Sequence, residues 1–147
     1  MLTSLGKLST ESQAIQEQIH KLAESKLMPA LKEAWTDLKK AVPTLEAVRW
    51  EQYTPYFNDG ETCTFSLHGV HFKLNSVKEG AKADYDDDFF DSYSIKNVGL
   101  TESQVEVLQS FEEELGHLEE LLEEAIGDHM QVTLNAEGIE TEEYSHD

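Results

Sequence analysis

Glutamates crowd the segment between residues 101 and 126, at positions that leave one side of a helix apolar. Carboxylates at helical spacing place rows of negative charge on one surface, and such rows can imitate duplex phosphates and bind a basic groove. No Lys or Arg stands nearby to relieve the repulsion, although like charges four residues apart destabilise a helix. The alternative interpretation is a solvated face that keeps the chain soluble. We expect a partner-binding acidic surface formed by Glu112, Glu113, Glu119, Glu120, Glu123 and Glu124.

A second acidic cluster lies at residues 84–88, where aspartates alternate as in a calcium-binding loop. Phe89, however, occupies the position at which that loop requires glycine, and no glutamate closes it at the twelfth position. We therefore expect no metal site here. The cluster is interpreted as a solvated loop or as an extension of the acidic surface, through Asp84, Asp86, Asp87 and Asp88.

Arg49 is the only arginine of the chain and marks a second candidate site. The alternation of residues 45–54 places it on the polar face of a strand, and an arginine among aromatic and hydroxyl groups can hold a small anion or nucleotide. The alternative is an ordinary outer sheet face, with Arg49 paired to Glu51 or to the acidic helix. The candidate ligand-binding residues are Arg49, Tyr53, Tyr56, Asn58, Asp59, His71 and Lys73.

No pattern of catalytic residues is present. The sequence contains no Gly-rich phosphate loop, no paired zinc-ligand spacing and no Ser-His-Asp context, and its six histidines form no metal motif. Cys63 has no basic neighbour to activate it. We therefore expect no catalytic residue, no metal, no cofactor and no enzymatic activity.

The net charge of −19 is concentrated in one third of the chain. Residues 97–147 hold fifteen Asp and Glu and no Lys or Arg. Such a surface repels phosphates and anionic lipids, which argues against direct nucleic-acid binding and membrane binding. No segment approaches the ~18 apolar residues that span a bilayer, no secretory leader is expected from residues 1–7, and a single cysteine fits a reducing cytoplasm.

The first element expected is helical, over residues 10–42. Thr10 and Gln13 have the spacing of a capping box, and two apolar runs follow that are out of phase by one position. We expect a kink or two helices near Pro29, and Pro43 ends the segment.

A β-meander is expected over residues 45–75. If His68-Gly69 is a two-residue turn, Leu67 faces Val70, Phe65 faces Phe72 and Cys63 faces Leu74, with all six on one side. The opposite side then carries Thr64, Ser66, His71 and Lys73.

The second half begins with an irregular Asp-rich loop over residues 76–98. An acidic helix over 101–126 follows, with a capping box at Thr101 and Gln104, an unbroken heptad seam from Leu108 to Ala125, and Gly127 as its C-terminal cap. Residues 128–147 form either a last hairpin or an acidic tail. These elements predict a single α+β domain over 1–147, in which two long, coiled-coil-like helical segments pack with a small antiparallel meander.

The segment from Trp50 to Gly60, with Cys63 and Phe65 just beyond, resembles a segment of small uncharacterised proteins of tailed phages. The resemblance covers about twenty of the 147 residues and brings no known activity. It implies a phage-encoded accessory protein that acts in the cytoplasm of a bacterial host.

Together these features predict a non-enzymatic acidic binding protein. Its partner would be a basic host protein, a nucleic-acid-handling or defence enzyme that is inhibited when its basic surface is occupied by a nucleic-acid mimic. One alternative is a protein that sequesters a small anion or nucleotide on the polar sheet face. Another is a virion or scaffold component that assembles as a homo-oligomer through its helix seams.

Overall fold

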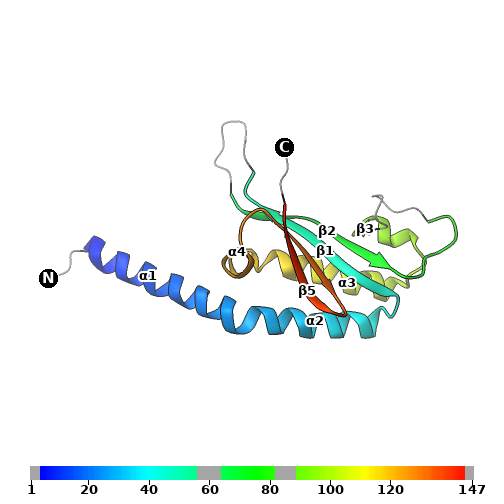
Figure 1. The fold of residues 1–147 in the computed structure, drawn as a ribbon, viewed down its shortest axis with the longest axis horizontal. Helices are drawn as coiled ribbons and strands as arrows, with labels where there is room; N and C mark the ends of the chain where they lie inside the picture. The colour runs from blue at the N-terminus through cyan, green and yellow to red at the C-terminus, as the bar shows by residue number, and fades with distance from the viewer. Residues whose placement is uncertain (1–3, 56–63, 82–88, 145–147) are drawn as a thin grey trace.

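The computed structural model describes residues 4–55, 64–81 and 89–144, which form an α+β fold. Helices cover one face of a five-stranded antiparallel sheet, and the N-terminal helix continues well beyond the sheet (Figure 1). The expected α+β class is confirmed, whereas coiled-coil pairing of two long helices is not shown. Of the two long helices expected, only the first is continuous.

That first helix consists of α1 (Ser4–Leu22), a π-helical turn η1 (Ala23–Leu27) and α2 (Met28–Ala41). A π turn closes its hydrogen bonds over five residues and accommodates one extra residue. This is the physical origin of the one-position slip between the two apolar runs. Pro29 is the second residue of α2, in its first turn, so the chain passes it without leaving the helix.

The predicted capping box at Thr10 and Gln13 is wrong. The helix is already formed at Ser4, and Thr10 lies inside it with its hydroxyl donating to the carbonyl of Gly6 at 3.0 Å. The predicted end before Pro43 is confirmed, since α2 ends at Ala41.

The strands are β1 (Leu45–Tyr53), β2 (Ser66–Leu74), β3 (Phe89–Asp91), β4 (Met130–Asn135) and β5 (Gly138–Glu143). Their order in the sheet is β3-β2-β1-β4-β5, so β1 is central and pairs with β2 on one side and β4 on the other. The C-terminal hairpin, one of two alternatives left open by the sequence, is therefore present.

The predicted turn at His68-Gly69 is wrong, because β2 runs through both residues. Arg49 pairs with His71 and Glu51 pairs with His68, so Gly69 and Val70 together oppose Trp50 in a β-bulge. Gly69 has φ +58°, and a Cβ there would lie 2.7 Å from Cε1 of His71. Glycine satisfies both constraints at this position.

The predicted single helix over 101–126 is also wrong. It is divided into α3 (Glu102–Gly116) and α4 (Glu119–Ile126), with Leu118 at φ −108° and ψ 18° between them. The capping box at Thr101 and Gln104 is confirmed, as is Gly127 at the C-terminal cap. The heptad seam lies inside the chain's own core, where Leu108, Leu115 and Leu122 are almost completely buried.

The Asp-rich loop is only partly irregular. Strand β3 and the 3-10 turn η2 (Ser94–Asn97) fall within it, and they bury Phe89, Phe90 and Ile95. The aspartates at 84–88 and Cys63 lie outside the described residues. Within the described part of the chain, no helix is both long enough and apolar enough to cross a membrane.

Candidate functional site

The six glutamates predicted as a partner-binding surface are not equivalent in the structure. Glu113, Glu120, Glu123 and Glu124 are exposed, whereas Glu112 and Glu119 are half-buried. Glu119 accepts a hydrogen bond from the backbone N–H of Leu67 at 3.0 Å, which ties α4 to β2. Its carboxylate is therefore structural. The predicted aspartates at 84, 86, 87 and 88 lie outside the described residues.

The exposed glutamates of α4 repel one another. Slight desolvation raises the pKa of the exposed Glu123 above its ordinary value, and the charges of Asp128, Glu124 and Glu120 raise it further. Among the described residues, the one ion pair formed by the glutamates of α3 and α4 is that of Glu124 with His20. This surface is thus strongly negative and has little internal compensation.

His20 joins α1 to α4. Its Nδ1 lies 2.6 Å from a carboxylate oxygen of Glu124, and its Nε2 lies 2.9 Å from one of Glu24. The hydrogen bond with Glu124 and the charge of Glu24 raise the pKa of His20 above its ordinary value of 6.5. Glu124 therefore has a partner within the chain, which the sequence did not indicate because 104 residues separate the two.

An NMR titration of the histidine ring protons tests this contact. The pKa of His20 is expected above 6.5, and Glu124→Gln should bring it back toward that value. Because the folded-state pKa is raised, the contact's contribution to stability is present below pH 6.5 and is lost as the pH rises through the folded-state pKa. Glu113→Gln, which removes an exposed carboxylate of α3, is the control and should leave the titration unchanged. An unshifted His20 in the wild-type protein would contradict the contact.

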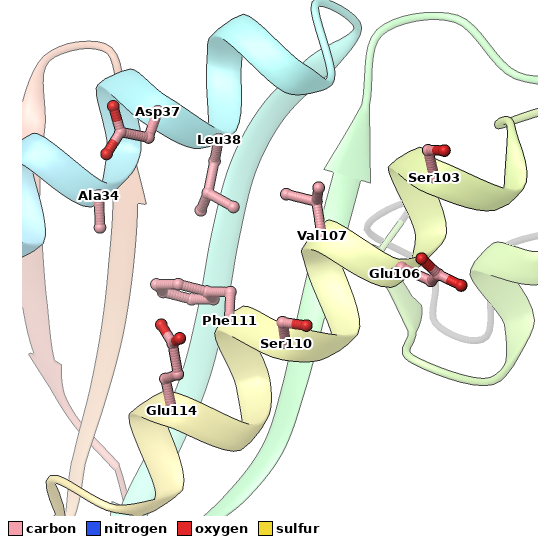
Figure 2. Close-up of a pocket in the computed structure, with 9 residues that line it drawn as sticks. All are labelled: Ala34, Asp37, Leu38, Ser103, Glu106, Val107, Ser110, Phe111 and Glu114. Atoms are coloured by element: carbon pink, nitrogen blue, oxygen red, sulfur yellow. The ribbon is translucent and has the colours of Figure 1, made fainter.

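A groove separates α2 from α3 (Figure 2). The groove is open to solvent and has a volume of about 520 Å³, and Leu38 of α2 and Val107 and Phe111 of α3 point into the space between the helices. Three exposed carboxylates also belong to its lining. The full lining is Ala34, Asp37, Leu38, Ser103, Glu106, Val107, Ser110, Phe111 and Glu114.

The carboxylates of the groove are Asp37, Glu106 and Glu114. Among the described residues, none of the three forms an ion pair with a lysine, arginine or histidine. Sequence reasoning missed this site because Asp37 lies in the charge-balanced N-terminal segment. Only the packing of α2 beside α3 brings it to the acidic helix. The groove and the exposed glutamates of α3 and α4 together form what we call the acidic surface.

The alternative site on the polar sheet face is partly assembled as predicted. Arg49, Tyr53, His71 and Lys73 share one face, while Tyr56, Asn58 and Asp59 lie outside the described residues. The guanidinium of Arg49 lies 4.3 Å from the centre of the Phe89 ring, and its Nε donates to the hydroxyl of Thr133 at 3.3 Å. The ring of Tyr53 stacks on that of His68, with centroids 3.8 Å apart.

The charges on this sheet face do not favour an anion. Burial raises the pKa of Glu51, and the charge of His71, a hydrogen bond from Gln131 and the charge of Arg49 offset this only in part. The hollow beside Arg49 and Lys73, about 370 Å³, is also lined by Glu46, Glu137 and Glu140. The guanidinium of Arg49 is therefore stacked on Phe89, and both Arg49 and Lys73 have carboxylates beside them in the same hollow.

The described residues contain no group of three or more His, Cys, Asp or Glu side chains that could hold a metal ion. Comparisons with protein-family models, curated proteins and solved structures found no match to this chain. The candidate site is therefore defined by its own geometry, as a groove with an apolar floor and an uncompensated acidic rim.

Proposed function

We propose that this chain is a non-enzymatic binding protein whose acidic surface engages a basic segment of another protein. The groove between α2 and α3 carries the proposal, because Asp37, Glu106 and Glu114 line it together with the buried apolar side chains of Leu38 and Phe111. A segment with lysines or arginines beside an apolar side chain complements both features. The apolar side chain would gain burial, and the cations would relieve the repulsion.

The partner class follows from the same charges. Proteins that handle nucleic acid present basic grooves, and rows of carboxylates compete with phosphates for them. The resemblance of Trp50–Phe65 to a segment of tailed-phage proteins supports a phage accessory protein that acts in the host cytoplasm. We therefore propose that the partner is a nucleic-acid-handling or defence protein of a bacterial host, and that binding inhibits it.

Affinity capture from bacterial lysate, followed by mass spectrometry, tests the proposal. The groove variant is Asp37→Asn, Glu106→Gln and Glu114→Gln, and a second variant replaces Glu113, Glu120 and Glu123 with Gln. A basic protein retained by wild type should be lost from the groove variant. With the purified partner, three lost charge contacts should weaken binding roughly 10- to 100-fold.

The matched control replaces Glu137, Glu140 and Glu142 with Gln. These side chains are exposed on the β4–β5 hairpin, so the control removes the same net charge from another surface. It should retain the partner with nearly wild-type affinity. Equal retention by all variants would show that the acidic surface serves solubility, and equal loss in all would show that only net charge matters.

A further inference from the structure

Helix α1 presents an apolar stripe that the rest of the described chain does not cover. None of its residues is buried, and beyond its contact with α4 near His20 it extends away from the sheet (Figure 1). The exposed fractions are 79% for Leu5, 61% for Leu8, 56% for Ile15 and 48% for Leu22. A helix of this length that packs only near its C-terminal end is marginal in water, so a partner for the stripe is expected.

The stripe has the spacing of a coiled-coil seam. Its positions follow one another at alternating steps of three and four residues: Leu5, Leu8, Ser12, Ile15, Ile19 and Leu22. Ser12 is the one polar residue among them. Ile19, next to the contact between His20 and Glu124, is half-buried, and the stripe becomes more exposed toward Leu5. We propose that α1 pairs in antiparallel orientation with α1 of a second copy of this chain.

Charge favours a second copy as the occupant. Helix α1 holds Lys7 and Lys21 against Glu11 and Glu17, so it is balanced apart from His20, whereas the whole chain carries −19. The positions flanking the stripe are Ser9, Gln16 and Gln18, with Glu11 as the one charge. This face repels another copy less than the acidic surface does. It also lacks the acidic rim that would attract the basic partner proposed above.

The antiparallel direction follows from register and repulsion. When Leu5 lies opposite Leu22 of the second copy, Leu8 meets Ile19, and Ser12 meets Ile15. Every position of the stripe then has a partner, and the two-fold axis lies near the middle of α1. The two acidic bodies come to lie at opposite ends of the helix pair. A parallel pair would place both bodies at the same end, against strong electrostatic repulsion.

Sedimentation equilibrium across a wide range of protein concentration tests the pairing. Wild type should approach twice the chain mass of 16.7 kDa. Leu8→Gln with Ile15→Gln should raise the dissociation constant by roughly 100-fold or more, since each dimer loses four apolar side chains. The control, Thr10→Gln with Glu17→Gln on the opposite face of α1, should dimerise like wild type. A wild type that stays monomeric, or a double variant that dimerises equally well, would overturn the proposal.

Disulfide trapping tests the orientation. In a Cys63→Ser background, chains with Leu5→Cys and chains with Leu22→Cys are tagged differently, mixed and oxidised. Antiparallel pairing should give disulfides mainly between the two kinds of chain, whereas parallel pairing would link each kind to itself. In protein dilute enough for wild type to be monomeric, urea unfolding followed by tryptophan fluorescence should be the same for wild type and for the Leu8→Gln and Ile15→Gln variant. This would show that the loss of pairing is not a loss of fold.

Discussion

Replacing Gln52 with Leu is expected to lower the free energy of unfolding by about 2–4 kcal/mol. Gln52 has no exposed surface and lies on the helix-facing side of β1. Its side-chain amide donates to the carbonyls of Leu122 at 3.0 Å and Gly127 at 2.8 Å, and its oxygen accepts from Nε1 of Trp50 at 3.0 Å. Leucine has a similar volume but leaves buried polar groups without this partner, and their desolvation dominates the cost.

Urea unfolding followed by tryptophan fluorescence measures this loss. The control is Gln131→Leu, the same substitution on the neighbouring strand β4, where the half-buried side chain belongs to the opposite sheet face. The control should cost less than about 1 kcal/mol, because solvent can replace the lost hydrogen bond. Equal losses in the two variants would contradict the assignment of Gln52 as the tie between β1 and the end of α4.

The role of Gln52 also shows where local patterns stop being informative. Gln52 lies two residues after Trp50 and four after Val48, so the period of a strand puts it on the same face as these apolar residues, and all three are fully buried. Two of its partners lie 70 and 75 residues further along the chain, and no periodicity within β1 carries that information. The face of a residue follows from its own strand, whereas its partner follows from the tertiary packing.

The tetrapeptide Thr-Glu-Ser-Gln occurs twice, at 10–13 and at 101–104, and forms a capping box only at the second. Before Thr101 the chain passes through Gly99 at φ +102°, which prevents a helix from continuing across it. Before Thr10, residues 4–9 are already helical, so the same side chains lie within a helix. A capping motif therefore predicts a helix start only where the preceding residues interrupt the helix.

The polar sheet face was predicted through incorrect geometry. A two-residue turn at His68-Gly69 places Ser66 and His71 on the same face of the sheet, and so does a single bulge at Gly69 and Val70. The turn and the bulge each interrupt once the alternation of side chains between the two faces. The choice between them depended on whether β1 pairs with residues 66–74 along their whole length. Hydrophobic alternation alone could not distinguish the two.

The heptad pattern similarly predicted apolar faces without predicting what covers them. Leu108 belongs to the seam of α3, which packs against the sheet, and it has no exposed surface. Leu8 is in phase with Ile15, Ile19 and Leu22 on α1, yet it is 61% exposed. The sequence signals are of the same kind, because both residues repeat with their neighbours at steps of three and four.

Leu108→Ala and Leu8→Ala therefore form a matched pair with opposite expected outcomes. Leu108→Ala should lower the free energy of unfolding by about 3–5 kcal/mol, since it opens a cavity in a packed helix–sheet interface. Leu8→Ala should change it by less than about 0.5 kcal/mol in dilute protein, because alanine suits a helix and no packing within the chain is lost. Urea unfolding at low and high protein concentration measures both.

Concentration is the variable that separates a core residue from an interface residue. The loss caused by Leu108→Ala should be the same at every protein concentration, because it arises within one chain. If α1 pairs with a second copy, the effect of Leu8→Ala should grow with concentration, since association adds stability only where the dimer forms. A large effect of Leu8→Ala in dilute protein would instead place Leu8 against its own chain. A small effect of Leu108→Ala would mean that α3 is not anchored to the sheet, and the groove between α2 and α3 depends on that anchoring.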